Sequence, residues 1–399
     1  MDASKAHHWW VAVDDTGTNH WSRKVRNGEA VVLAGLSELL ALTSGVRWAV
    51  DLTGTAPALL LAAHGQQVVY VPGRTVNRMS GAYRGEARTD ARDAYVFADT
   101  ARLRRDFAPV EVPTNLAADL VLLTTHRSDL IADRVRLLNR LHDVFTGISP
   151  ALEATFGYAD HKGALILLTG YQTPAALRRC GQARLTRWLA ARSVRHPETV
   201  AATALTAAHA QHIQLPGQDT AADITADLAS QVLALDERLK QLNGQISESF
   251  HTHPQAAVIE SMPGVGPILG AEFLVAAGDL AAYPDAGHLA AAAGLVPAAK
   301  DSGRRTGNLH RPKRYSRRLR RVFYLSAQTS IIRDGPNRTD YLKKRAEGHK
   351  HIPAIIALAR RRVDVPWALL RDNCLFTLAP PTAPAAAAGH RSRGSSLTP

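Results

Sequence analysis

Two long stretches of the sequence carry apolar residues at helical spacing, and they constrain the fold more than any other feature. One runs from Asn115 to Leu141 and the other from Thr220 to Ile246, with charged residues between the apolar ones. A helical pattern longer than about 25 residues is typical of coiled coils rather than of ordinary globular helices. We therefore predict two long helices that pack against one another or against a partner chain.

These helices and the composition around them divide the chain into four predicted regions. Strand and helix patterns alternate in residues 1–110, the coiled coil and a helical insert fill residues 111–252, and residues 253–376 are mostly helical. Residues 377–399 are rich in Pro, Ala, Gly and Ser and are predicted to be disordered. The expected fold class is an α/β domain with a mixed sheet, joined to all-α parts.

The charge of the chain favours a polyanionic partner. Lys and Arg number 48 against 35 Asp and Glu, which gives a net charge of +13. The only cysteines, Cys180 and Cys374, fit a reducing cytoplasm and offer no zinc site. Apolar runs are short or interrupted, and no signal peptide is visible, so we expect neither a membrane span nor secretion.

Strands and helices alternate in the first hundred residues. The predicted strands are Trp9–Val13, His20–Val25, Arg47–Leu52 and Gln67–Val71, and the predicted helices are Glu29–Leu42 and Ala56–His64. A loop rich in Arg and Gly follows, and a further helix begins after Thr89. This alternation indicates a mixed sheet whose ligands bind at the carboxyl ends of the strands.

Four carboxylates stand at informative places in this region. Asp51 ends a predicted strand, and Asp2 precedes the first hairpin. Asp90 and Asp93 lie three residues apart in the first turn of a predicted helix, so they project from one face. Acidic residues in a first turn also complement the helix dipole, and that explanation remains open for this pair.

Carboxylates are the ligands that Mg²⁺ or Mn²⁺ prefers in proteins. Two such ions about 3.5–4 Å apart can activate a nucleophile and stabilise the leaving oxygen of a phosphodiester. A meander of three strands, a strand that ends in an acid and a later helix with acids is the ribonuclease H arrangement. Asp14 and Asp15 compete for the place of the first acid, but a turn between the first two strands accounts for both.

Two further segments could bind nucleic acid. The helical insert between the long helices carries Arg178, Arg179, Arg184, Arg187, Arg192 and Arg195, which together could form a nucleic-acid surface although each alone fits a solvated helix face. Further on, Gly264 and Gly266 form a Pro-Gly-x-Gly turn before an apolar helix at 268–277. Such a turn could clamp phosphate with its backbone N–H groups, like a helix-hairpin-helix, or could be a plain tight turn.

The strongest positive segment lies between Lys300 and Arg321, with ten Lys or Arg residues against one Asp. Aromatic residues are few here, so contact with the nucleic-acid backbone is better supported than base stacking. Ser302 lies in this segment and could attack a phosphodiester, although on local chemistry alone it is more often a loop residue. The basic residues that we assign to nucleic acid are Arg304, Arg305, Lys313, Arg314, Arg317, Arg318, Arg320 and Arg321.

Two sets of motifs in this order resemble the DEDD transposases of the insertion-sequence 110 family. The segments Asp2–Lys5, Trp48–Asp51, Val71–Val76 and Thr89–Ala94 resemble its RuvC-like domain. The segments Met262–Gly266, Ala293–Pro297 and Ser302–Gly303 resemble its C-terminal transposase domain. The resemblance covers residues 2–107 and 255–372, and the middle matches only as a helical spacer.

The resemblance implies roles for particular residues. Asp2, Asp51, Asp90 and Asp93 would be the acidic tetrad that binds Mg²⁺ or Mn²⁺, with Asp51 in a position that is usually Glu. Ser302 would be the covalent nucleophile, and Ser316 and Ser326 are poorer matches. Only Met1 precedes Asp2, whereas the family's first acid follows a stretch of strand. Either translation starts upstream or this copy has lost part of its first strand, and we favour the upstream start.

The family also implies a function and partners. We expect a DNA transposase that excises and inserts an insertion sequence, guided by a structured bridge RNA, in the cytoplasm near the nucleoid. A dimer or tetramer through the coiled coil is expected, because strand exchange needs several active sites. Two alternatives are a RuvC-type junction nuclease that uses only the acids and a non-catalytic nucleic-acid-binding protein descended from a transposase.

Overall fold

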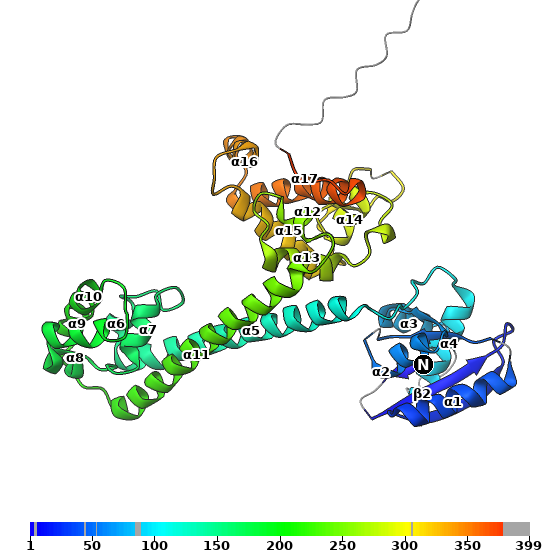
Figure 1. Ribbon diagram of the computed structural model, residues 1–399, viewed down its shortest axis with the longest axis horizontal. Coiled ribbons are helices and arrows are strands. Elements are labelled where there is room, and N and C mark those ends of the chain that lie inside the picture. Colours follow the sequence, from blue (N-terminus) through cyan, green and yellow to red (C-terminus); the bar gives the residue numbers. More distant parts are fainter. Residues whose placement is uncertain (4–5, 44, 53, 84–88, 305, 378–399) are drawn as a thin grey trace, which may run out of the picture. The chain divides into compact units, whose positions relative to one another are not determined.

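The computed structural model describes residues 1–3, 6–43, 45–52, 54–83, 89–304 and 306–377, and every side chain among them except those of Asp2 and Ala3. The chain divides into two compact units, Met1–Thr114 and Asn115–Pro399. The first unit holds strands β1 to β5 and helices α1 to α4, and the second is mostly helical (Figure 1). Each unit is described by itself below.

The first unit is built on five strands, which form a three-stranded antiparallel sheet and a parallel pair. Strands β1 (Asp2–Ala3), β2 (His7–Val13) and β3 (Asn19–Arg26) are antiparallel, and β4 (Arg47–Val50) and β5 (Gln67–Tyr70) are parallel. The amino group of Met1 donates a hydrogen bond to the carbonyl of Ala49 at 2.8 Å, which places the beginning of β1 beside β4. The parallel pair β4-β5 thus lies beside the β1 edge of the three-stranded sheet β1-β2-β3.

Helices cover both faces of these strands. Helices α1 (Glu29–Leu42) and α2 (Ala56–Ala63) share one core with Trp48 and Val50 of β4. Helices α3 (Gly73–Ser80) and α4 (Asp90–Leu103) share another core with Ala49, the residue between those two. This alternation follows from the period of two along a strand, which sends successive side chains to opposite faces.

Helix α3 differs from the sequence prediction, which placed a loop rich in Arg and Gly after β5. The helix has eight residues, and only Val76 among them is buried. A single buried apolar residue leaves no helical periodicity to detect in the sequence. The other predicted helices and strands of this unit lie within a few residues of their expected positions.

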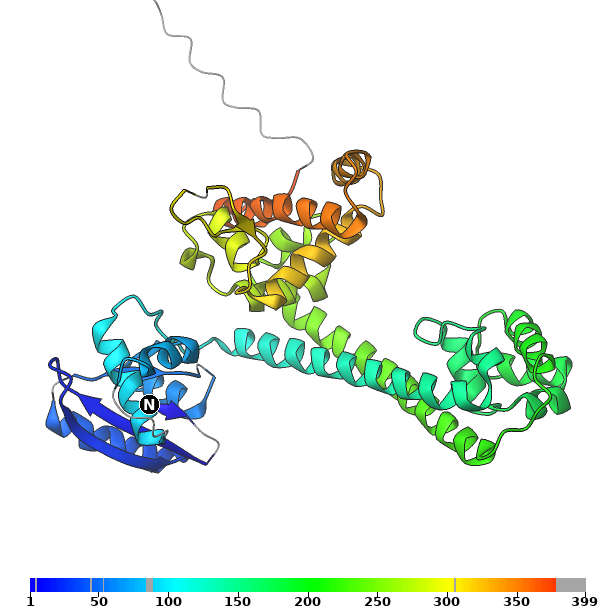
Figure 2. The same ribbon diagram turned by 180° about the vertical axis from the view of Figure 1, so that it is seen from behind.

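The second unit is organised around helices α5 (Asn115–Ile148) and α11 (Gln218–His251), which contain 34 residues each. The two helices lie side by side (Figure 1, Figure 2). Polar contacts join them in addition to apolar packing: Arg134 pairs with Asp236, and Arg127 Nε donates to Asn243 Oδ1 at 2.7 Å. The sequence left open whether these helices pack against one another or against a partner chain. In the structure they pack against one another.

Five short helices form the insert between α5 and α11. They are α6 (Pro150–Glu153), α7 (Lys162–Leu168), α8 (Pro174–Cys180), α9 (Gln182–Ala190) and α10 (Pro197–His209). Their apolar residues share a core with Leu141 and Phe145 of α5 and with Val232 of α11. The insert is thus anchored on one end of the long helix pair.

The remaining helices pack on the other end of that pair. They are α12 (Ala256–Glu260), α13 (Pro267–Ala277), α14 (Ala286–Ala292), α15 (Arg317–Ser330), α16 (Pro336–Ala346) and α17 (His351–Asp372), with a 3₁₀ turn η1 (Leu280–Ala282). A two-stranded hairpin of β6 (Ala298–Ala299) and β7 (Leu309–His310), which the sequence did not predict, lies between α14 and α15. Their core also contains Leu120 of α5 and Phe250 of α11. The division of the chain into four regions, made from the sequence, stays a prediction.

In the part of the chain that the structure describes, no helix is long and apolar enough to cross a membrane.

A buried carboxylate, Glu272, ties three helices of this second core together. Its side chain is 5% exposed and pairs with Arg127 of α5 at 3.1 Å and with Arg321 of α15 at 2.8 Å. Removing one partner of a buried ion pair leaves the other charge uncompensated, which costs about 3–5 kcal/mol. We expect Glu272→Ala to lower the free energy of unfolding by this order in urea denaturation. Glu248→Ala, at an exposed site on α11, should change it by less than about 0.5 kcal/mol.

Candidate active site and nucleic-acid interface

The predicted acids of the first unit lie on β1, at the end of β4 and at the start of α4. Asp51 directly follows β4 and is half-buried. Asp90 and Asp93 occupy the first turn of α4, where Asp90 is exposed and Asp93 half-buried. The hydroxyl oxygen of Thr89 accepts a hydrogen bond from the N–H of Arg92 at 3.3 Å and so fixes where the helix begins.

Helix α4 packs against β1, β2 and β4, so it lies over the strands that carry Asp2 and lead to Asp51. Carboxylate oxygens suit Mg²⁺ or Mn²⁺, and in that respect the residues fit a metal ion. Among the side chains that the structure describes, no three His, Cys, Asp or Glu residues gather closely enough to hold one. The side chain of Asp2 lies outside the described residues, and the described acids do not assemble the site by themselves.

A third acid on α4, Asp99, has a structural role. It is 5% exposed, accepts a hydrogen bond from the hydroxyl of Tyr83 at 2.5 Å and pairs with Nε of Arg102 at 2.6 Å. Burial, together with the hydrogen bond to Asp99, raises the pKa of Tyr83. Arg102 also donates to the carbonyl of Asp15 at 3.0 Å, so the network joins α4 to the hairpin turn. The sequence signal is an acid and an arginine three residues apart on one helix.

Asp14, the competing first acid, is used by the turn between β2 and β3. Its Oδ1 accepts hydrogen bonds from the N–H groups of Thr16 and Thr18, each at 2.9 Å. Its Oδ2 lies 2.8 Å from Nε2 of His20. The hydroxyl of Thr16 also donates to Oδ1 at 2.6 Å, and this bond, followed by the one from His20, holds the pKa of Asp14 well below its usual range. The turn thus engages both carboxylate oxygens of Asp14.

Ser302 lies in the loop of the β6–β7 hairpin. The loop is held by a hydrogen bond from the N–H of Lys300 to the carbonyl of Asn308 and by another from the N–H of Asn308 to Oδ1 of Asp301, both 2.9 Å long. Gly303 follows with a φ of +56°, a conformation that favours glycine. Ser302 is exposed, which leaves it accessible to a large substrate.

The two other serines considered for this role have structural partners. Ser326 is 2% exposed and accepts hydrogen bonds from the guanidinium of Arg362. Ser316 caps α15 by accepting from the N–H of Leu319 at 3.2 Å. Ser302 is therefore the one of these three serines that lies exposed in a loop.

The structure divides the predicted basic residues into two groups. Three have internal partners: Arg318 donates to Thr124 at 2.8 Å, Arg320 donates to the carbonyl of Gly294 at 3.0 Å, and Arg321 pairs with Glu272. Arg305 lies outside the described residues. Arg321 is exposed although it is ion-paired, and the other exposed members of the set are Arg304, Lys313, Arg314 and Arg317.

The two glycines of the predicted phosphate clamp differ in their surroundings. Gly264 has a φ of +82°, and a Cβ atom there would lie 2.8 Å from the carbonyl oxygen of Ser326 on α15. Gly266 directly precedes α13, is exposed, and would meet nothing within 4 Å. Gly264 is thus required for packing on α15, whereas an anion could reach the backbone at Gly266.

This difference gives a matched pair of substitutions. We expect Gly264→Ala to lower the free energy of unfolding by about 2 kcal/mol or more, because the left-handed backbone and the clash with α15 both oppose a side chain. Gly266→Ala should change it by less than about 1 kcal/mol. Thermal unfolding of the two variants measures the contrast, and equal destabilisation would contradict the packing role of Gly264.

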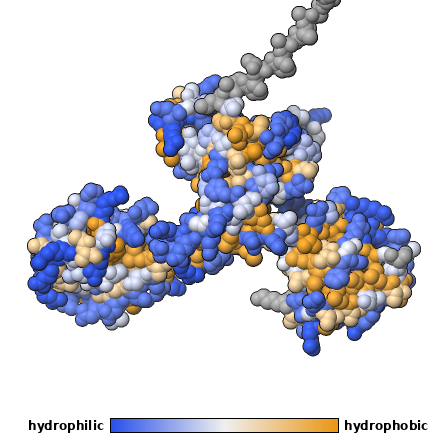
Figure 3. All heavy atoms as spheres, in the orientation of Figure 1, coloured by the Kyte–Doolittle hydropathy of each residue, from blue (hydrophilic) through white to orange (hydrophobic). Residues whose placement is uncertain are grey.

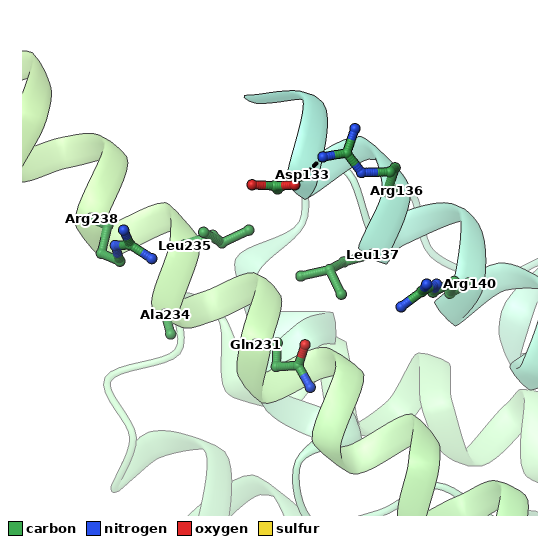
Figure 4. A pocket seen from close by; sticks show the side chains of 8 residues that line it. All are labelled: Asp133, Arg136, Leu137, Arg140, Gln231, Ala234, Leu235 and Arg238. Atoms are coloured by element: carbon green, nitrogen blue, oxygen red, sulfur yellow. Dashed lines mark hydrogen bonds and ion pairs between the residues drawn. The ribbon is translucent and has the colours of Figure 1, made fainter. Parts of the chain in front are cut away.

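A groove of about 500 Å³ runs between α5 and α11 (Figure 4). Leu137 and Leu235 form part of its lining, together with Arg136, Arg140 and Arg238. Its one acid, Asp133, is paired with Arg136. The groove therefore offers positive charge and apolar surface, and its only carboxylate is engaged in an ion pair.

Comparison with known proteins agrees with the motifs. Residues 1–150 match a family of DEDD type described as "Transposase", and residues 256–343 match the "Transposase IS116/IS110/IS902 family". The chain is 60% identical over 384 residues to an uncharacterised 44.8 kDa protein of insertion element IS116 from Streptomyces clavuligerus, with 96% of each chain covered. It is 48% identical over 391 residues to an uncharacterised 42 kDa protein of insertion element IS900 from Mycobacterium paratuberculosis, covering 96% of this chain and 98% of the relative.

A third relative, an uncharacterised 43.6 kDa protein of insertion element IS110 from Streptomyces coelicolor, is 34% identical over 381 residues and 94% of each chain. These matches span both ends of the sequence and the helical middle. They confirm the family predicted from the motifs. The chain belongs to the IS110 family of transposases.

Proposed function

We propose that this transposase cuts and rejoins DNA at the ends of its element and at a target, using a carboxylate site in the first unit and Ser302 in the second. The arrangement of the strands supports the proposal: β1, at the edge of the sheet β1-β2-β3, begins beside β4 of the parallel pair β4-β5, and the same succession of strands is found in ribonuclease H-like nucleases. In this arrangement Asp2 falls on β1 and Asp51 directly after the neighbouring strand β4. Asp90 and Asp93 stand at the start of the helix that packs across both.

Asp2, Asp51, Asp90 and Asp93 are the residues that would hold Mg²⁺ or Mn²⁺. When bound, such an ion supplies positive charge against the phosphate undergoing substitution. Aspartate at position 51 has a shorter reach than the glutamate usual there. Asp99 and Asp14 are left out of the proposed set because both are engaged in structural contacts.

Ser302 is proposed as the nucleophile. Its Oγ forms a bond to phosphorus as the bond from phosphorus to a deoxyribose oxygen breaks, and the proton lost by Oγ is balanced by the proton that this oxygen gains. A phosphoserine link to DNA results, and a hydroxyl of another strand reverses the step. Arg304, two residues further along the same loop, would stabilise negative charge on the phosphate, and Lys313, which follows β7, would add positive charge.

A bridge RNA and a dimer or tetramer complete the proposal. The RNA is inferred from the family resemblance, and the surplus of basic residues supports it. Apolar side chains on α5 support a second chain, because Leu122 is 68% and Val135 51% exposed. Both helices already pack on one another, so such a contact would use the outer faces.

Reconstitution tests this function. Purified protein, Mg²⁺, donor and target plasmids, and RNA transcribed from the DNA that flanks the gene should give recombinant junctions detectable by sequencing. We expect omission of the RNA to reduce recombinants by at least about tenfold, the effect of losing even 1.4 kcal/mol of recognition energy. Equal recombination without RNA would contradict guidance and leave the DNA chemistry standing.

A further inference from the structure

The outer end of the helical insert carries a dense group of arginines that the proposed chemistry does not use. Six arginines and no acidic residue lie between Arg178 and Arg195. They belong to α8, α9 and the loop before α10, at the end of the insert away from the long helices (Figure 1, Figure 2). Hydrophilic residues line this outer edge in the space-filling view (Figure 3).

One of the six arginines is structural. Arg178 donates hydrogen bonds to the carbonyls of Ala208 and Gln211, and so holds α8 against the end of α10. The other five side chains are exposed: Arg179, Arg184, Arg187, Arg192 and Arg195. Five arginine side chains are therefore exposed to solvent at the outer end of the insert, on helices that Arg178 helps to hold together.

Helix α9 has an outward face suited to close approach. Arg184 and Arg187 lie on this face with alanines at 183 and 190, all of them exposed, while Leu185 and Leu189 are buried on the opposite side. Small residues beside the arginines allow another surface to come near the helix backbone. A face of arginine and alanine fits the major groove of duplex DNA, which is wide enough to admit an α-helix.

The loop that follows α9 holds further cations in place. The guanidinium of Arg192 lies 3.7 Å from the centre of the Trp188 ring and donates to the Trp188 carbonyl at 3.2 Å. Ser193 and His196 both have a positive φ, 56° and 55°, which is uncommon for residues other than glycine. Arg192 and Arg195 are thus carried on a tightly turned segment at one end of α9.

The aromatic residues of this end favour a duplex over an unpaired strand. Trp188 and Tyr171 are half-buried and pack edge to face, with ring centres 5.1 Å apart. Arg192 covers a face of the Trp188 ring, so that face is not open for stacking on a base. Single-strand binding depends on such open aromatic faces, whereas contact with a duplex depends on charge and helix shape.

We propose that α9 of the insert docks in the major groove of duplex DNA, with Arg184 and Arg187 towards the base edges. Arg179 and Arg195 on either side would contact the phosphates. A transposase acts on DNA, and this surface would be a second DNA-binding site of the protein. It is separate from the basic segment Lys300–Arg321 and from the proposed catalytic residues. The inference does not depend on the assignment of Ser302 or of the acids.

Fluorescence anisotropy of the full chain with a labelled duplex of about 30 base pairs tests the proposal, since this length spans about three helical turns. We expect Arg184→Gln with Arg187→Gln to weaken duplex binding at least about tenfold. Arg179→Gln with Arg195→Gln should reduce the slope of log affinity against log salt by about 2. Arg238→Gln with Lys240→Gln, an equal loss of exposed charge on α11, is the control.

The basic segment Lys300–Arg321 is also expected to attract DNA, so the variants are repeated with Lys313, Arg314 and Arg317 changed to Gln. In that background the α9 pair should remove most of the remaining duplex affinity. An α9 pair that behaves like the α11 control would overturn the proposal. An equal loss of affinity for single-stranded DNA or RNA of the same sequence would also overturn the proposal, because this surface would then bind an unpaired strand. Circular dichroism verifies that each variant is folded.

Discussion

Ser302→Ala is expected to abolish the proposed covalent adduct between this protein and DNA. The hydroxyl is the only atom group that the substitution removes, and the side chain lies exposed in the loop between β6 and β7. Adduct and recombinants should fall at least about a thousandfold, as loss of a nucleophile does in other enzymes. The adduct is measured as labelled DNA that migrates with the protein on a denaturing gel.

The matched control is Ser316→Ala. Ser316 caps α15, and loss of its hydrogen bond to Leu319 should cost about 1 kcal/mol of stability while the adduct still forms. Ser302→Ala should leave the unfolding temperature unchanged. Strand cleavage that survives in Ser302→Ala would favour a junction nuclease that uses the acids alone.

Periodicity predicted most of the fold because the elements that carry it bury a continuous stripe. Helices α5 and α11 place apolar residues such as Leu138 and Val232 in shared cores, and the signal persists over many turns. The β6–β7 hairpin has two residues in each strand, all exposed, so no alternation could reveal it. Its loop is held by a hydrogen bond from the N–H of Asn308 to Asp301, which joins residues seven positions apart.

The sequence predicted which residues form the candidate site better than it predicted the contacts that these residues make. Sequence distinguishes Asp90 from Asp99 only by neighbouring motifs, whereas burial and the contacts with Tyr83 and Arg102 separate their roles directly. In the basic segment, Arg318 and Arg321 look like their neighbours in sequence, but partners more than 40 residues away engage them. Such long-range pairing depends on how helices pack and leaves no local pattern.

The acids of α4 allow a second decisive experiment. This one helix carries two proposed metal ligands, Asp90 and Asp93, and one carboxylate with structural contacts, Asp99. Asp90→Asn and Asp93→Asn should each reduce metal-dependent DNA cleavage about 100-fold or more, since charge held around a metal is worth several kcal/mol. Their effect on the free energy of unfolding should stay below about 1 kcal/mol, the size of a helix-dipole interaction. Cleavage of a labelled duplex in Mg²⁺ and urea denaturation measure the two quantities.

Asp99→Asn should behave in the opposite way to the two acids at the start of α4. It removes the charge that accepts from Tyr83 and pairs with Arg102, so we expect a loss of about 1.5–3 kcal/mol in the free energy of unfolding. Cleavage per folded molecule should persist below the unfolding transition. If Asp90→Asn and Asp93→Asn leave cleavage intact, their carboxylates serve only the helix dipole. Because the three acids share one helix, this comparison separates metal chemistry from the stability of that helix.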